Sequence, residues 1–416
     1  MRHEGHAVPA RRRVALGGLA LGLLGMAVVA GGDEPRWLTL EEALAMAEKG
    51  PLAQAAGFEI QRVRAEKRGA GLWPNPEIQF DRESVGEEVE RIAAVSLALP
   101  VSGRLGLERS AARSAVTAAE RRGGQERIER RARVREAFLD LLAAQERDRV
   151  LDDGLGRLDH LVKVVRAREV EGESSGYDRM RVEQERADLA AQRLDGRGAL
   201  ARAQGGLAWL LGLASEPMTA EGTLAAGATL FPDTGEARAQ ALGRGDVEAL
   251  SAEADQRDLL GRAAGRRAVP EPSLLVGRKT ACAGGACGSG AALGFTVSVP
   301  LFDRGQGPSA ALRAEAAIAR ARRAALGLQA AAEADAALAE VRAGREAEAV
   351  LSQAPSPQRI LDIAQASYEV GEVRIFELLD AYRSALSVTL RATEIRLAVR
   401  KAEVALDRAT GTERMP

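Results

Sequence analysis

An internal repeat limits the possible folds of this chain more than any other feature. Residues 92–104 read IAAVSLALPVSGR, and residues 292–304 read ALGFTVSVPLFDR. Both segments alternate residues in the period of a β-strand, reach a proline and end on an arginine. Each follows a strand-like segment with two prolines near its start, at 73–80 and 269–276. Because several landmarks recur in register, the chain contains two copies of one structural unit.

Each copy is predicted to contain a shorter helix, a strand pair, a very long helix, a glycine-marked turn and a last helix. In the first copy these elements are expected at about 38–69, 73–101, 104–171, 172–176 and 177–212. In the second copy they are expected at about 236–267, 272–301, 307–370, 371 and 374–411. The predicted division is a signal peptide at 1–30, a first repeat at 31–212, a linker at 213–235 and a second repeat at 236–416.

Apolar residues in the long helices have the spacing of a coiled coil. Leu151, Leu155, Leu158, Val162 and Val165 are separated by alternating steps of four and three residues. A helix of roughly 65 residues is on the order of 100 Å long, at 1.5 Å per residue. A compact domain does not need helices of this length. The pattern therefore favours long packed rods over two ordinary helical hairpins.

The strands are too few to close a barrel within one chain. Small closed barrels need about eight strands, and only four are predicted here. The strands form either a small sheet or one part of a sheet that several chains share. Three chains would supply twelve strands, an even number that outer-membrane barrels allow.

The N-terminus has the pattern of an export signal. Three consecutive arginines at 11–13 precede an apolar and glycine-rich run at 14–29, and the small residue Ala30 offers a cleavage site. A single anchoring helix is the alternative, although the run is short for a span of about 20 residues. No later apolar run approaches that length. The mature chain is therefore expected to be periplasmic, secreted or a β-barrel protein.

Composition argues against an enzyme and against nucleic-acid binding. Charged residues make up 28% of the chain, and the net charge of −1 comes from interspersed acids and bases rather than a basic face. Once a signal peptide containing His3 and His6 is removed, His160 is the one histidine left. This excludes most histidine-based triads and zinc sites. We therefore expect no catalytic residues, no cofactor and no metal site.

Four motifs carry a resemblance to a known family. They are LTLEEAL at 38–44, WPNPEI at 73–78, PLFDRGQG at 300–307 and YEVGEVRIFELLDAYRSAL at 368–386. The chain resembles the TolC-like outer-membrane efflux proteins, which are the exit ducts of tripartite pumps. WPNPEI and PLFDRGQG are most similar to the CzcC-like branch, which is associated with heavy-metal efflux.

The resemblance implies a mainly α fold with a small β part. Duplicated coiled-coil helices would form an α-barrel in the periplasm, and four strands per chain would contribute to a twelve-stranded, trimeric β-barrel in the outer membrane. The implied partners are two further copies of the chain, outer-membrane lipid, a periplasmic membrane-fusion adaptor and an inner-membrane RND pump. The implied function is passive conduction of substrate, with heavy-metal cations as the expected cargo.

The second turn is expected to form the periplasmic gate. Glu377 and Asp380 lie three residues apart and therefore share a helix face. The resemblance implies that such carboxylates line the duct entrance, where three-fold symmetry gives two acidic rings that attract cations. Tyr368 and Arg374 are expected to contribute contacts between neighbouring protomers. The alternative is that the carboxylates only solvate a surface helix.

Both turns are expected to dock the adaptor, although either can be a simple turn. Ser175 or Asp178 is predicted to cap the helix that follows the first turn. The residues expected at the docking tips are Gly172, Glu173, Ser175, Gly176, Asp178, Gly371 and Glu372.

Cys282 and Cys287 lie in the predicted loop TACAGGACGSG between two strands. In an oxidising compartment a disulfide is the first expectation. Free thiols are the alternative, and a metal site lacks further ligands because no histidine is near.

Two other functions fit parts of the pattern. A periplasmic coiled-coil adaptor or scaffold would also contain a long helical hairpin, although an adaptor usually has one hairpin rather than two. Within the duct interpretation, drugs and secreted polypeptides are alternative cargoes, because a conduit need not bind what it conducts.

Overall fold

The computed structural model describes residues 36–213, 217–225 and 230–414. All of them belong to one unit, Pro35–Pro416. The expected signal peptide at 1–30 lies outside the described residues. None of the helices within the described ranges combines the length and the apolar character that a membrane span requires.

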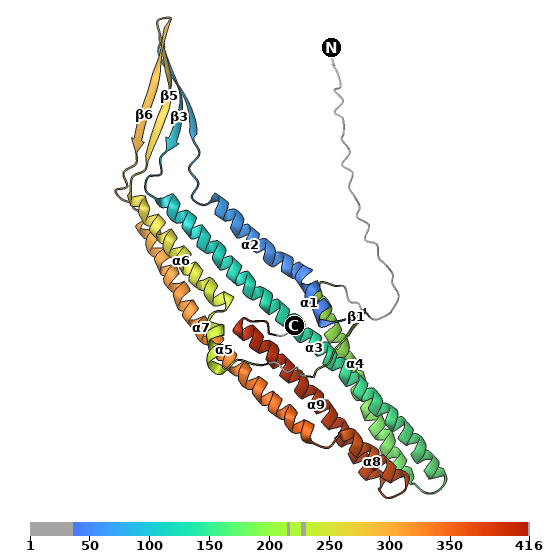
Figure 1. The fold of residues 1–416 in the computed structure, drawn as a ribbon. Coiled ribbons are helices and arrows are strands. Elements are labelled where there is room, and N and C mark those ends of the chain that lie inside the picture. Colours follow the sequence, from blue (N-terminus) through green and yellow to red (C-terminus); the bar gives the residue numbers. More distant parts are fainter. Residues whose placement is uncertain (1–35, 214–216, 226–229, 415–416) are drawn as a thin grey trace, which may run out of the picture. The chain divides into compact units, whose positions relative to one another are not determined.

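The fold is mainly α with a small β part, as predicted (Figure 1). The first half contains β1 (Arg36–Leu38), α1 (Leu40–Lys49), α2 (Pro51–Gly69), β2 (Glu77–Val85), β3 (Glu88–Ala98), α3 (Arg104–Val170) and α4 (Gly176–Leu211). The second half contains β4 (Met218–Ala220), α5 (Thr234–Leu242), α6 (Gly245–Gly265), the 3₁₀ turn η1 (Arg266–Ala268), β5 (Pro272–Ala283), β6 (Ala286–Val297), α7 (Gln306–Gln353), α8 (Pro357–Glu369) and α9 (Ile375–Thr410).

Three predicted helices are each divided in two. The first breaks at Gly50 and Pro51 into α1 and α2, and its counterpart in the second half breaks into α5 and α6. The predicted unbroken helix at 307–370 is also wrong, because α7 ends before Pro355 and α8 begins at Pro357. A proline has no backbone N–H and restricts the residue before it to an extended conformation. Pro51 therefore starts α2, and Pro355 with Pro357 separates α7 from α8, whereas the break between α5 and α6 falls at Gly243 and Arg244 without a proline.

The two strand pairs join into one antiparallel sheet in the order β2-β3-β5-β6. The contact between the two copies runs along β3 and β5, where Ala94 lies opposite Gly277. A second, parallel pair between β1 and β4 lies partly in the predicted linker. It fixes the start of the first half to the start of the second.

Gly277 allows β5 to approach β3 closely. A Cβ atom at Gly277 would lie 2.4 Å from the carbonyl oxygen of Ala93 and 2.5 Å from the Cβ of Ala94. Any larger residue must push the two strands apart where the repeats meet.

We expect Gly277→Val to lower the free energy of unfolding by about 1–3 kcal/mol, the usual cost of overpacking. The matched control is Gly290→Val on the same sheet, where a Cβ atom meets nothing within 4 Å. Thermal unfolding in detergent checks both variants. Equal unfolding temperatures for the two variants would show that the close approach does not limit sheet pairing.

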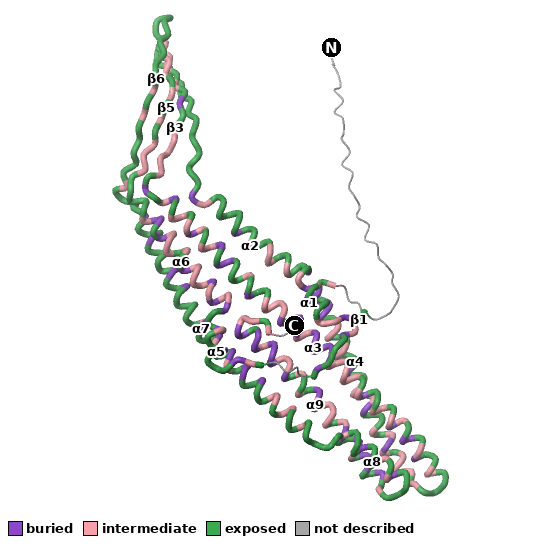
Figure 2. Tube along the Cα trace, viewed as in Figure 1, coloured by how far each residue is buried: buried purple, intermediate pink, exposed green. Residues whose placement is uncertain are grey.

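Buried residues follow the helix contacts rather than forming one central core (Figure 2). One apolar cluster joins α1, α3 and α4 with β1 and β4, and a second, alanine-rich cluster joins α5, α7 and α9. A third cluster, the tip cluster, lies near the α3–α4 and α8–α9 turns. It contains Leu151, Leu158, Val162 and Val165, with Leu155 packed against it, which confirms the predicted seam.

Candidate functional site at the hairpin tips

The two hairpin turns have the same backbone geometry. Tip 1 connects α3 to α4, and tip 2 connects α8 to α9. Gly172 in tip 1 has φ +80°, and Gly371 in tip 2 has φ +82°. This left-handed conformation favours glycine, and it places each turn at the end of a helix as a C-terminal cap. The two repeats therefore share the backbone conformation of their turns as well as the order of their elements.

The first turns of the helices that leave the two tips share one capping hydrogen bond. In tip 1, Ser175 Oγ accepts a hydrogen bond from the Asp178 N–H at 3.2 Å, and the Asp178 carboxylate accepts one from the Ser175 N–H at 3.1 Å. In tip 2, the Glu377 carboxylate accepts a hydrogen bond from the Arg374 N–H at 2.8 Å. Asp178 and Glu377 thus occupy the same position, three residues after the cap.

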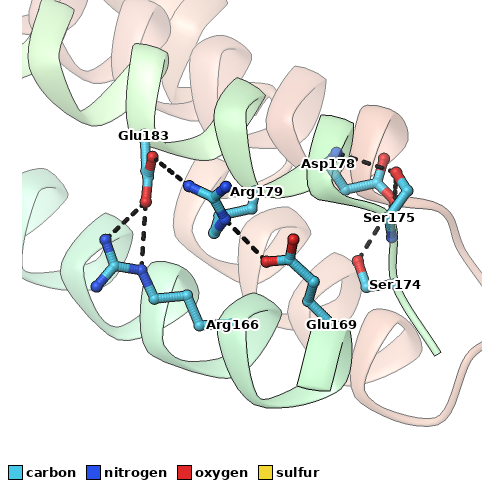
Figure 3. Close-up of polar contacts among 7 residues, drawn as sticks. All are labelled: Arg166, Glu169, Ser174, Ser175, Asp178, Arg179 and Glu183. Carbon is cyan, nitrogen blue, oxygen red and sulfur yellow. Dashed lines mark hydrogen bonds and ion pairs between the residues drawn. The ribbon is translucent and has the colours of Figure 1, made fainter. Parts of the chain in front are cut away.

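Tip 1 carries a network of ion pairs between α3 and α4 (Figure 3). Glu183 lies 2.7 Å from Arg166 and 3.0 Å from Arg179, which in turn lies 2.8 Å from Glu169. Hydrogen bonds from Arg166 and Arg179 lower the pKa of Glu183 below its ordinary value of 4.5. The network joins the two helices of this hairpin just before the turn.

We expect tip 1 to loosen in acid. Because the pKa of Glu183 is lowered in the folded protein, its contribution is complete above pH 4.5 and is lost as the pH falls through the lowered value. Amide exchange of tip 1 relative to tip 2, measured in one sample to cancel the intrinsic pH effect, should rise in that range. Glu183→Gln should raise the ratio at neutral pH and remove the acid step. A ratio that does not change with pH would contradict the assignment.

Tyr368 does not lie on the surface of tip 2. Its ring is buried in the tip cluster, under the guanidinium of Arg168 at 4.8 Å. Burial raises the pKa of its phenol. The ring packs against its own chain. The expected contact of Tyr368 with a neighbouring protomer stays a prediction. Arg168 completes this link by donating to the carbonyls of Tyr368 and Glu369 at 3.1 and 2.7 Å.

The remaining expected gate residues are exposed. Arg374, Glu377 and Asp380 all lie at the start of α9 with exposed side chains. Glu377 holds the cap described above, and Asp380 lies on the same helix face. Two carboxylates on one exposed face attract cations wherever this face borders a narrow passage.

The sequence interpretation missed an exposed aromatic pair at the tips. Tyr177 and Phe376 each stand two residues after their helix cap, and each is 61% exposed. The Arg181 guanidinium lies 6.0 Å from the Tyr177 ring and 5.7 Å from the Phe376 ring, so it bridges the two hairpins. The sequence does contain a sign of this pair, because an aromatic residue stands at the same position after the turn in both repeats.

Cys282 and Cys287 form a disulfide with an S–S distance of 2.09 Å. They lie opposite each other on β5 and β6 rather than in a loop, because the strands extend to Ala283 and Ala286. Among the described residues there is no group of three or more histidine, cysteine, aspartate or glutamate side chains that could hold a metal ion.

Comparison with known proteins agrees with this fold. Residues 244–412 match the family described as "Outer membrane efflux protein". The outer-membrane channel OprN is similar, with a TM-score of 0.75 and 19% identity, over 91% of this chain and 91% of that chain. CusC has a TM-score of 0.75 and 20% identity, over 90% of this chain and 92% of that chain. The outer membrane protein VceC of Vibrio cholerae has a TM-score of 0.73 and 17% identity, over 90% and 97%.

Among curated proteins, no sequence is significantly similar to this chain. At these identities the structural matches establish the fold. The chain has the architecture of outer-membrane channels over nearly its whole length.

Proposed function

We propose that this chain belongs to the outer membrane efflux proteins and forms one third of an exit duct in a tripartite efflux system. The observation that carries the proposal is the likeness in fold to outer-membrane channels, which covers 91% of this chain and of OprN. The family match at 244–412, which falls in the second repeat, also supports it. The helical part is proposed to stand in the periplasm and the sheet in the outer membrane.

The sheet favours assembly of this chain with further identical chains. Among the described strands, the outer strands β2 and β6 each have a partner on one side only. Large apolar side chains such as Ile78, Phe80 and Phe295 are exposed on it. Edge strands with free N–H and C=O groups readily pair with further strands. Three copies would supply twelve strands, and closing the sheet would leave no edge and give the apolar side chains lipid contacts.

Glu377 and Asp380 are the proposed selectivity residues. Both are exposed near tip 2, and three copies would give two rings with six carboxylates. Such rings concentrate cations and repel anions at a narrow entrance. Arg374 is proposed to serve the same entrance, since its side chain is exposed beside them.

The exposed surface of the two tips is the proposed docking site for a periplasmic membrane-fusion adaptor, with an inner-membrane RND pump beyond it. Tyr177, Phe376, Val170 and Val370 present apolar area there. Aromatic side chains and arginine, such as Arg181 between the rings, are common energetic centres of protein interfaces.

Heavy-metal cations are the proposed cargo, in keeping with the acidic entrance and with the CzcC-like motifs. Deleting the gene in its bacterium should lower tolerance to divalent metal cations and raise their retention in the periplasm. The wild-type gene should restore both, and the variant Glu377→Gln with Asp380→Asn should restore them only partly. Unchanged metal tolerance with lost tolerance to organic dyes would assign the duct to drugs instead.

A further inference from the structure

The second long helix is interrupted where the first is not. α3 runs unbroken from Arg104 to Val170, whereas the equivalent stretch is divided into α7 and α8 (Figure 1). Residues 354–356 lie between them and are exposed. Pro355 and Pro357 contribute no backbone N–H, so the hydrogen-bond ladder that stiffens α3 is interrupted at this point. Such a break is a common location for a change in helix direction.

α8 packs through a narrow stripe. Leu361 and Tyr368 point into the tip cluster, while Ile360 and Ile363 on the same short helix are exposed. A helix of this length has little stability of its own, because helices shorter than about 12–15 residues are marginal without tertiary contacts. The position of α8 therefore depends on what else holds it.

Two arginines of α3 hold α8, one near its middle and one at its C-terminal end. The Arg157 guanidinium lies 3.2 Å from the Asp362 carboxylate near the middle of α8. Arg168 donates to the carbonyls of Tyr368 and Glu369 in the last turn. The Tyr368 carbonyl also accepts a hydrogen bond from the Gly371 N–H at 3.1 Å. A cation is favourable at this negative end of the helix dipole. Arg157 and Arg168 are about three helical turns apart and so lie on one face of α3.

We propose that α8 is a hinged segment that pivots at residues 354–356 and is latched to α3 by Arg157 and Arg168. Because α8 carries tip 2 and leads directly to Glu377, its release would move the acidic entrance of one protomer. This role in opening the duct rests on the proposed function, whereas the hinge and the latch stand on the contacts alone. The first repeat has no counterpart, since α3 is continuous.

Distances between spin labels test the hinge directly. The chain's two cysteines are joined in the disulfide, so introduced cysteines can be labelled selectively. One pair, Ala343→Cys with Arg359→Cys, spans the break from α7 to α8. The matched control pair, Ala144→Cys with His160→Cys, has the same sequence separation within α3. Both pairs span about 24 Å along an ideal helix. Labelled chains are diluted with unlabelled chains and measured in detergent.

We expect a broad distance distribution across the break and a narrow one within α3. Adding Arg157→Gln and Arg168→Gln should broaden the first distribution further and leave the second unchanged. Adding Pro355→Ala and Pro357→Ala instead should narrow the first to the width of the control. Retained helical circular dichroism shows that each variant is folded.

Each outcome decides one part of the proposal. Equally narrow distance distributions for both pairs would overturn the hinge. A distribution across the break that stays broad after the proline replacements would overturn the location of the hinge. A distribution across the break that does not broaden when the two arginines are replaced would overturn the latch. A failure of the proposed function appears elsewhere, as absence of conductance by the wild-type protein, and would leave the label distances unchanged.

Discussion

Replacing both Glu377 with Gln and Asp380 with Asn is expected to remove most of the cation preference of the reconstituted channel. Three copies lose six negative charges at the entrance. A single charge pair in contact contributes about 1 kcal/mol even in water, and about 1.4 kcal/mol corresponds to a tenfold change. The ratio of cation to anion permeability should therefore fall by about tenfold or more. Block by divalent cations should weaken in parallel.

The substitutions are chosen to preserve the fold. A glutamine at position 377 keeps an oxygen that can accept the hydrogen bond from the Arg374 N–H, which measures 2.8 Å. The control is Glu394→Gln, an exposed change farther along α9. A permeability ratio equal to that of the wild type would show that these two carboxylates only solvate the helix.

The second large effect is expected at the ion pair between Arg135 and Asp407. It joins α3 to α9, and the two groups lie 3.2 Å apart with side chains only 3% and 5% exposed. Removing one partner of a buried pair leaves a buried charge and costs about 3–5 kcal/mol. Asp407→Ala should therefore lower the free energy of unfolding by about this amount, measured by thermal unfolding in detergent.

A double variant distinguishes the net contribution of the ion pair from the cost of leaving one buried charge without its partner. Arg135→Met with Asp407→Leu removes both charges and fills similar volume, so most of the lost stability should return. The exposed pair Arg391–Glu394, with side chains 68% and 54% exposed, provides the control, because such pairs contribute about 0–1 kcal/mol. A double variant as unstable as Asp407→Ala would show that packing rather than charge dominates at this position.

The repeated pattern was enough to predict the order of the main elements. The strands, the long α3 and both turns are encoded by local signals: alternation before a proline, heptad spacing and a glycine at each reversal. The short pair β1–β4 was not predictable, because three residues per strand carry no measurable period. Pro355 and Pro357 indicate the division of α7 from α8. The correspondence with the unbroken helix of the first repeat nevertheless predicts one continuous helix.

The candidate site was harder to predict because its contacts connect the two copies. Tyr368 belongs to the motif that predicts the entrance, yet its ring is buried under Arg168, a residue of the other hairpin. Arg181 likewise meets Phe376 only in the folded chain. No local pattern identifies which of many arginines on a helix will reach across to another hairpin. The two cysteines are predicted in a loop but lie on strands, because the length of a strand depends on the strand that pairs with it.

Single-channel recording tests the exit-duct proposal most directly. The purified full-length protein is added to a planar lipid bilayer that holds different salt concentrations on its two sides. A trimeric duct with an acidic entrance should insert to give uniform conductance steps with a reversal potential that favours cations. Stable protein that stays in solution without detergent, and gives no conductance, would contradict the duct and favour a periplasmic scaffold.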